Sequence, residues 1–291
     1  MSQRETKRAE PTASSGPVRW GRWLPLLLAV AGCTDGNASP RHPAGKPRLD
    51  EPTSANPTSD GPAAASHRES AHLELLDVPD HSPAVVWVPP PGNRPQPLVV
   101  AAHGAGGRPE WHCDFWSRIV EDRGFVLCPR GRRIDRGVPH DRSSYYFPDH
   151  FWLERVVSAA MDALGFRFTG RVDVSDAVYA GYSQGAIMGA LIVAPDPARF
   201  PRAVFVEGGG AEWNVPIGSK YLAGGGQGVA FVCGVSACDA AARRALQHLD
   251  RAGLPARRAY APGAGHTYLG PVEPLVAAAF EWLVAADPRW R

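Results

Sequence analysis

The sequence predicts an α/β fold in which a mostly parallel central sheet is covered by helices on both faces. Short apolar runs recur along the chain without polar alternation, as in strands that are buried on both sides. Segments of helical length separate these runs, and strands that alternate with helices favour parallel pairing through right-handed crossovers. The chain has 31 Gly and 29 Pro among 291 residues, but 44% hydrophobic residues and 9 Trp exclude a wholly disordered protein.

The elements are expected in a regular order. The first two strands cover 73–78 and 84–88, with a proline-rich turn between them. Further apolar runs predict strands at 97–102, 125–128, 177–180, 203–206, 229–232 and 256–260. Helices are expected at roughly 110–122, 150–164, 184–194, 239–252 and 272–286. The last helix has the clearest apolar stripe, which includes Leu275, Ala279 and Trp282.

Residues 1–32 have the layout of a secretory signal peptide. Basic residues precede an apolar run at 24–31, which is far shorter than the roughly 20 residues that span a bilayer. The run ends in Val30-Ala-Gly-Cys33, which resembles the lipobox of bacterial lipoproteins. The resemblance implies that Cys33 is lipidated and anchors the protein to a membrane. The alternative is an ordinary signal peptide with an incidental cysteine.

The mature chain is expected to begin with a tether. Residues 33–70 hold the lipidated cysteine and a Pro/Ser/Ala-rich linker with too few large apolar side chains to offset its chain entropy. One folded domain is expected over 71–291. The lipoprotein resemblance also implies export to the cell envelope. Because Thr34 replaces the Asp that often favours inner-membrane retention, the periplasmic or outer-membrane face is expected.

A serine motif follows the predicted strand 177–180. Gly181-Tyr-Ser-Gln-Gly185 is G-x-S-x-G between a strand and a helix, the context of a nucleophile elbow. The sharp turn is expected to expose Ser183 Oγ above the sheet edge, and a structural turn serine is the alternative. On these residues the span 71–291 resembles the α/β-hydrolase fold serine esterases. More narrowly, it resembles the secreted polyhydroxybutyrate-depolymerase and feruloyl-esterase group.

The resemblance implies roles for two loops. The loop His103-Gly-Ala-Gly-Gly107 follows the third strand, and its Ala105 N–H is expected to form the oxyanion hole together with the N–H of Gln184. The base should follow the nucleophile in the chain, and His266 lies in a Gly- and Pro-rich loop after the final strand. His103 is expected to hold its loop rather than to act as the base.

Two carboxylates remain open as the acid that orients His266. Asp239 follows strand 229–232, where the resembled family usually carries its acid, but it lies two residues beyond the usual spacing. It could equally be the first-turn acid of the next helix, where the helix dipole favours a negative charge. Glu207 directly follows strand 203–206, and some α/β-hydrolases carry the acid there. Asp239 is the first choice and Glu207 the alternative.

Cysteine spacing predicts two disulfides. With Cys33 lipidated, four cysteines remain, and proximity in the sequence favours the pairs Cys113–Cys128 and Cys233–Cys238. Such bridges fit the oxidising compartment that the export signal implies. Free buried thiols are the alternative. A metal site is not expected, because the sequence has no C-x₂-C pair with clustered histidines.

These observations together predict a lipid-anchored serine hydrolase that cleaves small or polymeric carboxylic esters through an acyl-enzyme. No cofactor is required, and a net charge of +2 does not suggest nucleic acid as a partner. A peptidase or thioesterase of the same fold, and a catalytically silent binding lipoprotein, are the alternatives. The aromatic residues Tyr145, Tyr146, Phe147, Trp111 and Trp152 are expected either to line a substrate pocket or to cover the sheet edge.

Overall fold

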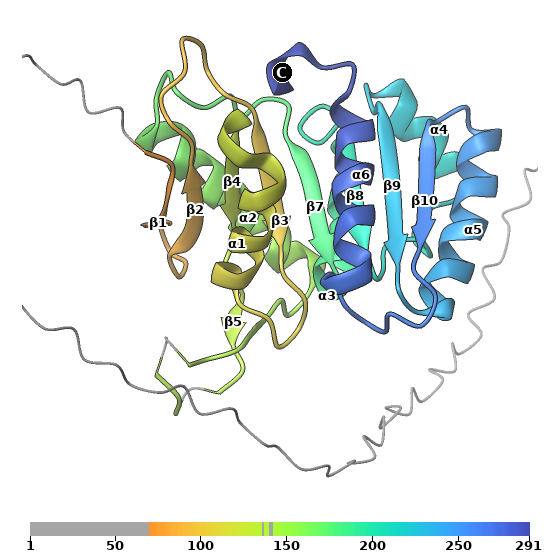
Figure 1. Cartoon of the computed structure of the whole chain (residues 1–291), viewed down its shortest axis with the longest axis horizontal. Helices are drawn as coiled ribbons and strands as arrows, with labels where there is room; N and C mark the ends of the chain where they lie inside the picture. The colour runs from red at the N-terminus through yellow and green to blue at the C-terminus, as the bar shows by residue number, and fades with distance from the viewer. Residues whose placement is uncertain (1–69, 136, 140–141) are drawn as a thin grey trace, which may run out of the picture. The chain divides into compact units, whose positions relative to one another are not determined.

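A computed structural model describes residues 70–135, 137–139 and 142–291 of the chain (Figure 1). The predicted signal peptide at 1–32, Cys33 and the linker up to residue 69 lie outside the described residues. The folded part begins with the first strand at His72, one residue after the predicted domain start.

The centre of the fold is one sheet of eight strands, in the order β1-β2-β4-β3-β7-β8-β9-β10. The strands are β1 (His72–Leu76), β2 (Ala84–Val88), β3 (Leu98–Ala102), β4 (Phe125–Cys128), β7 (Val178–Tyr182), β8 (Arg202–Val206), β9 (Gly228–Cys233) and β10 (Ala256–Tyr260). β2 pairs antiparallel with β1 and β4, and all other neighbours pair in parallel. The predicted mostly parallel sheet is therefore confirmed. Because the parallel strands end at one edge, the loops that follow them meet there.

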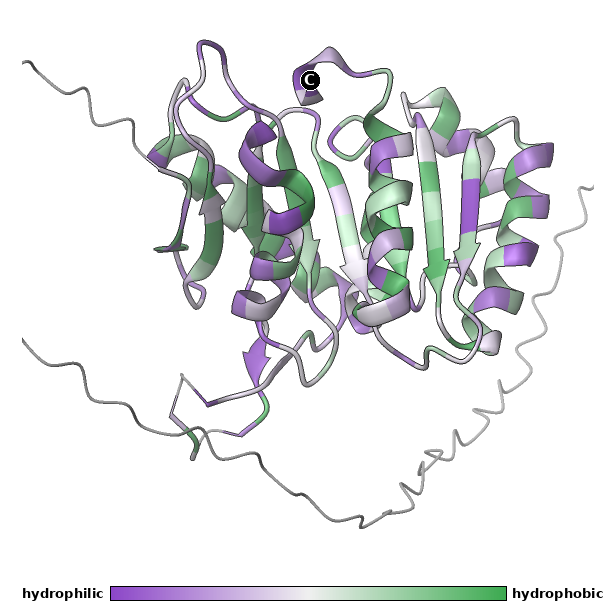
Figure 2. Ribbon diagram, viewed as in Figure 1, coloured by the Kyte–Doolittle hydropathy of each residue, from purple (hydrophilic) through white to green (hydrophobic). Residues whose placement is uncertain are grey.

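Helices cover both faces of this sheet. α1 (Pro109–Val120) and α6 (Glu273–Val284) pack on one face, and they lie in front of the sheet in Figure 1. α2 (His150–Arg167), α3 (Gln184–Val193), α4 (Val215–Ala223) and α5 (Ser236–Arg251) contribute to the core on the other face. Alternate residues of β3 enter the two cores, Val99 on the first face and Val100 on the second. Figure 2 shows the central strands as mainly hydrophobic, and α5 as hydrophilic on its outer side.

Local signals explain where the helices begin. The side chain of Asp149 caps α2 by accepting from the N–H of Trp152 at 2.7 Å, and Asn214 caps α4 by accepting from Ile217 at 3.0 Å. α1 begins with Pro109, whose missing N–H costs nothing in the first turn.

The structure also contains elements that the sequence did not predict. α4 was missed because Pro216 and Gly218 interrupt its apolar pattern. β5 (Arg132–Arg133) and β6 (Tyr145–Tyr146) form a short antiparallel pair inside the long segment after β4. α5 begins at Ser236, three residues before the predicted start, so Asp239 lies in its first turn.

Both predicted disulfides are present in the structure. Cys113 of α1 is bridged to Cys128 at the end of β4, and Cys233 at the end of β9 is bridged to Cys238 of α5. Disulfides are typical of oxidising compartments outside the cytoplasm. Within the described part of the chain, no helix has both the length and the apolar character required to cross a bilayer.

Candidate active site

Ser183 lies in a strained turn between β7 and α3. Its φ of 52° is in the left-handed region, which a residue with a Cβ rarely adopts. A Cβ on Gly185 would overlap the carbonyl oxygen of Ala102, and one on Gly181 would lie 2.5 Å from the carbonyl oxygen of Gly185. Glycine is therefore required at both flanking positions of the motif. The turn leaves the Ser183 side chain partly accessible at the sheet edge.

His266 lies in the loop after β10 and faces Ser183. The distance between His266 Nε2 and Ser183 Oγ is 2.8 Å, which is a hydrogen bond. Gly263 and Gly265 have φ of 78° and 80°, so two glycines supply the backbone turns that bring the ring back over the sheet. The structure thus brings together Ser183 and His266, which the sequence analysis predicted as nucleophile and base.

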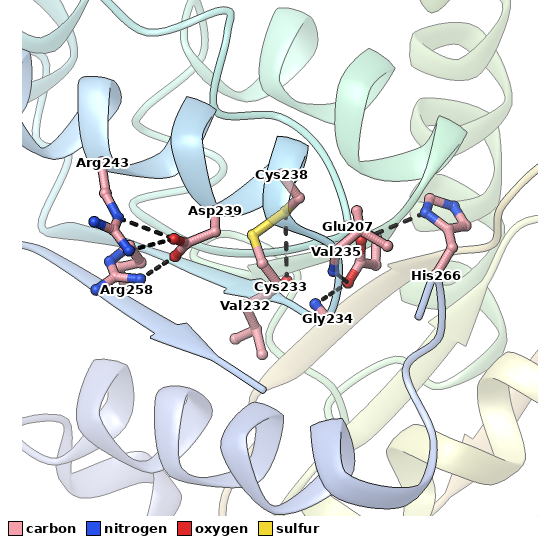
Figure 3. Close-up of a disulfide and its surroundings, with 10 residues drawn as sticks. All are labelled: Glu207, Val232, Cys233, Gly234, Val235, Cys238, Asp239, Arg243, Arg258 and His266. Atoms are coloured by element: carbon pink, nitrogen blue, oxygen red, sulfur yellow. Dashed lines mark hydrogen bonds and ion pairs between the residues drawn. A yellow bond between two sulfur atoms is a disulfide. The ribbon is translucent and has the colours of Figure 1, made fainter. Parts of the chain in front are cut away.

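The carboxylate beside His266 is that of Glu207. Its Oε2 lies 3.4 Å from His266 Nδ1, and its side chain is completely buried whereas that of His266 is 51% exposed. Oε1 accepts hydrogen bonds from the N–H groups of Gly234 and, at 3.3 Å, Val235 (Figure 3). Oε2 has no hydrogen-bond partner among the described residues, so the contact to His266 is its principal polar interaction. Bonds of this kind are often long before substrate binds.

Asp239, the first choice from the sequence, is not aimed at His266. Its carboxylate forms ion pairs with Arg258 of β10 and with Arg243 of α5, the latter at 2.7 Å. Figure 3 shows these contacts on one side of the Cys233–Cys238 disulfide, with Glu207 and His266 on the other. The geometry therefore disagrees with Asp239 as the orienting acid and supports its other interpretation, a charge in the first turn of α5. Its place after strand β9 favoured Asp239 in the sequence, whereas the structure puts this residue in the first turn of α5 beside two arginines.

Glu207 and Ser183 have similar positions and backbone conformations. Both residues directly follow a parallel strand, and the φ of Glu207 is 56°. Non-glycine residues with positive φ persist where the surrounding structure holds them, and they concentrate at functional sites. The backbone N–H of Glu207 donates to Val232 at 2.9 Å, and that of Ser183 donates to Val206 at 2.8 Å. The neighbouring strands therefore hold both turns.

The loop after β3 lies against the nucleophile. A Cβ on Gly104 would be 3.1 Å from Ser183 Cβ and 2.9 Å from Tyr182 Cδ1, so glycine allows this approach. Gly106 and Gly107 donate their N–H groups to Tyr145 and Gly104, whereas no backbone hydrogen bond is formed by the Ala105 N–H within the described ranges. Gln184 is the first residue of α3, where N–H groups lack an acceptor in the helix.

His103 is hydrogen-bonded to the loop after β3 and to the segment after β4. It is buried, its Nδ1 is 2.8 Å from the Gly104 carbonyl oxygen, and its Nε2 accepts from the N–H of Gly131 at 3.2 Å. These partners require the neutral ring with its proton on Nδ1. Burial lowers the pKa of His103 to about 4, which preserves this form. The structural role expected for His103 agrees with these contacts.

Tyrosines support the loop that carries His266. The Tyr182 hydroxyl donates to the His266 carbonyl oxygen at 2.8 Å, and the Tyr182 ring packs edge-on against Tyr268. Burial is the main cause, and the charge of Glu207 the next, of the rise in the pKa of Tyr182 to about 12. The hydroxyl therefore stays protonated and able to donate. His112 lies 5.2 Å from Tyr268, ring to ring, and burial lowers its pKa to about 3.

The aromatic residues that the sequence offered for a pocket or a sheet-edge cover differ in their burial. Tyr145 and Phe147 are fully buried, and the Phe147 ring stacks on His103 at 4.6 Å, so both are core residues. The N–H of Phe147 also donates to the Gln184 side chain at 2.7 Å, which ties this segment to α3. Trp111 is 57% exposed. A substrate pocket lined by all of these aromatic rings is therefore not what the structure contains.

The comparisons with known proteins agree with the fold. No protein-family model and no curated protein sequence matches the chain. Among solved structures, a dienelactone hydrolase from Anabaena variabilis is similar with a TM-score of 0.51 and 16% identity, over 75% of this chain and 98% of its own. The fluorophosphonate-binding serine hydrolase F of Staphylococcus aureus gives a TM-score of 0.52 and 10% identity, over 74% of this chain and 99% of its own.

A third solved structure, of a thermostable esterase, gives a TM-score of 0.51 and 18% identity, over 74% of this chain and 63% of that one. Identities this low establish the architecture only. The sheet order, the helices on both faces and these neighbours define the chain as an α/β-hydrolase fold protein.

Proposed function

We propose that this protein is a serine hydrolase that cleaves carboxylic esters through an acyl-enzyme intermediate. The observation that carries the proposal is the line of three side chains at the sheet edge. Ser183 Oγ is hydrogen-bonded to His266 Nε2, and His266 Nδ1 faces the buried Glu207 carboxylate. A nucleophile, a base and an orienting acid in this order are the arrangement that activates a serine.

The first half of the reaction follows from these contacts. Ser183 Oγ attacks the acyl carbon while His266 Nε2 takes its proton. The negative oxygen that develops on the substrate accepts hydrogen bonds from the N–H groups of Ala105 and Gln184, which are worth about 10²–10³ in rate for each such donor. Glu207 accepts from His266 Nδ1–H and stabilises the imidazolium. His266 then gives its proton to the departing alcohol, which leaves an acyl group on Ser183.

The second half repeats the proton transfers with water. His266 takes a proton from a water molecule, whose oxygen attacks the acyl carbon, and the proton returns to Ser183 Oγ as the carboxylic acid leaves. Apart from this water, every catalytic group is a side chain or a backbone N–H of this chain, so the proposal requires no cofactor. The similarity to an esterase and to dienelactone hydrolases in fold supports esters as the first substrate class to test.

A panel of substrates tests this proposal. p-Nitrophenyl esters of graded acyl length, feruloyl esters and a polyester film are compared with matched amides and thioesters. We expect ester hydrolysis by the full chain and none by Ser183→Ala, because that variant lacks the attacking oxygen. Preference for the amides or thioesters would indicate a peptidase or thioesterase. No turnover on any substrate would favour a silent binding protein.

We further propose that the mature protein is a lipoprotein of the cell envelope, anchored through Cys33. The lipobox-like run before Cys33 and the two disulfides in the folded domain support export. Multiple acyl chains at ~0.8 kcal/mol per buried CH₂ give stable anchoring. Detergent phase partitioning and the mass of the mature N-terminus test this. Recovery from the aqueous phase with unmodified Cys33 would contradict it.

A further inference from the structure

We infer that the Cys233–Cys238 disulfide is a positioning element for the proposed reaction. It fixes the turn between β9 and α5, and this turn holds the Glu207 carboxylate against His266 (Figure 3). The inference rests on the proposed function, because it concerns the residue assigned there as the orienting acid. It also gives the bridge a role beyond stabilising the fold.

The turn consists of the two residues between the strand and the helix. β9 ends at Cys233 and α5 begins at Ser236, which leaves Gly234 and Val235. The N–H groups of both donate to Oε1 of Glu207. These two donors occupy one oxygen of the carboxylate, so the other oxygen, Oε2, points to His266 Nδ1. The direction of the carboxylate therefore depends on where the two N–H groups lie.

The disulfide closes this turn at its ends. Cys233 is the last residue of β9, and Cys238 lies in the first turn of α5, with 5.6 Å between their Cα atoms. A covalent link across so few residues prevents the start of α5 from separating from the end of β9. Gly234 and Val235 lie within the loop that the disulfide closes. The closed loop restricts the backbone conformations that Gly234 would otherwise allow the turn.

The turn is also held from outside and contacts the base. Asp239, next to Cys238, binds Arg258 of β10. A Cβ on Gly234 would lie 3.0 Å from Glu207 Oε1 and would overlap the carbonyl oxygen of Gly265, the residue before His266. The turn is therefore packed between the acid and the loop of the base. A displacement of the turn would move the carboxylate relative to the imidazole.

The chain contains a natural control for this argument. The Cys113–Cys128 bridge links α1 to β4 in the core on the face of α1 and α6, and it closes 15 residues instead of 5. Both of its cysteines are fully buried, whereas Cys238 is partly exposed. The entropic model predicts that the longer loop contributes more to stability. If each bridge only stabilised the fold, loss of Cys113–Cys128 would be the more damaging change.

Serine double variants separate the two roles. In Cys233→Ser/Cys238→Ser we expect kcat for p-nitrophenyl acetate to fall by about 10–100-fold with KM little changed. The reason is that moving a catalytic group by about 1 Å can lower the rate about 10²-fold. In Cys113→Ser/Cys128→Ser we expect a larger fall in Tm, but a kcat within about threefold of the parent, measured where the variant is folded. Equal kcat losses in the two variants, or no loss in the first, would overturn the inference.

The same pair of substitutions in a Glu207→Gln background tests the route of the effect. If the bridge acts through the carboxylate, its loss should reduce kcat by less than about threefold once that carboxylate is gone, since coupled sites are non-additive. A full loss in that background would place the effect elsewhere and contradict the proposal.

Reduction of the folded wild-type protein avoids any failure of a variant to fold. Dithiothreitol transfers its two thiol hydrogens to the sulfurs of Cys233 and Cys238 and closes to its own cyclic disulfide. Burial should protect Cys113–Cys128 under mild conditions. We expect kcat to fall as free thiols appear at Cys233 and Cys238, which alkylation and mass spectrometry of quenched aliquots would record. In samples that are not alkylated, reoxidation should restore kcat. Unchanged kcat in protein whose Cys233 and Cys238 are both reduced would overturn the inference.

A readout that needs no turnover distinguishes this inference from the proposed function. A proton held between His266 Nδ1 and Glu207 gives a low-field proton resonance, which Glu207→Gln should abolish. We expect reduction of Cys233–Cys238 to weaken or shift this resonance, whether or not esters are cleaved. If the resonance survives reduction unchanged, the positioning role is refuted. If it responds but no ester is hydrolysed, only the proposed function fails.

Discussion

The exchange of Glu207 for Gln is the sharpest perturbation of the site, because it changes charge and hydrogen bonding but not shape. The Gln oxygen would keep the bonds from Gly234 and Val235, so the amide nitrogen would face His266 Nδ1. An amide N–H donor there requires Nδ1 to be an acceptor, which moves the ring proton to Nε2. His266 would then point a proton at Ser183 and could not accept the one that the serine must lose.

The size of this effect follows from the chemistry of such triads. The corresponding exchange in serine proteases costs about 10⁴ in kcat through the same wrong tautomer. We expect a kcat loss of about 10³–10⁴-fold here, which corresponds to about 4–5.5 kcal/mol at roughly 1.4 kcal/mol per tenfold change. KM should change little, because Glu207 is buried and out of reach of substrate. The assay is the steady-state hydrolysis of a p-nitrophenyl ester.

Asp239→Asn is the matched control for this experiment. It removes a negative charge from a buried carboxylate close to the same disulfide, but from one that binds Arg258 and Arg243. We expect a stability loss of about 1–3 kcal/mol and a kcat within about tenfold of the parent. The reasoning is refuted if the folded Asp239→Asn protein is inactive while Glu207→Gln retains most of its activity.

Further outcomes are expected from the same structure. Burial lowers the pKa of His103 to about 4 and that of His112 to about 3, whereas an unfolded histidine titrates near 6.5. Below about pH 6.5 the unfolded chain therefore binds protons that the folded chain does not, so the free energy of unfolding should fall on acidification, by about 3 kcal/mol from His103 alone near pH 4. Denaturant titrations at pH 7 and pH 4.5 check this sign, and His112→Phe should reduce the slope. Gly104→Ala should lower kcat by about tenfold or more, because the added Cβ pushes the loop away from Ser183. Normal turnover with Ala at that position would argue against the loop as part of the oxyanion hole. Cys33→Ser should move the protein from the membrane to the soluble fraction of cells, as cell fractionation would reveal.

Most of the fold could be predicted from the sequence, because the buried strands are short continuous runs of apolar residues. The serine turn was predictable because both glycines of the motif are sterically required between β7 and α3. The helix α4 was not, since Pro216 and Gly218 conceal its period and its capping by Asn214 is a local signal of one residue. For Tyr145 and Phe147 the sequence left a pocket and a sheet-edge cover open, because both residues pack against His103, more than 40 residues earlier in the chain.

Sequence spacing could not select the carboxylate that faces His266. Asp239 and Glu207 were both compatible with the sequence, and position after β9 favoured Asp239. The choice depends on contacts between distant segments: Glu207 meets two N–H groups from the turn after β9, and Asp239 meets an arginine on β10. Neither contact leaves a periodic or local pattern.

The central claim, an activated serine at the end of β7, has a direct test. A fluorophosphonate probe reacts with a serine only when a base removes its proton, and peptide mapping then locates the adduct. We predict one adduct on Ser183 in the wild-type protein and in Asp239→Asn, slower labelling in Glu207→Gln, and none in His266→Ala. Absence of label on Ser183 in folded wild-type protein, or an adduct on another residue alone, would contradict the account.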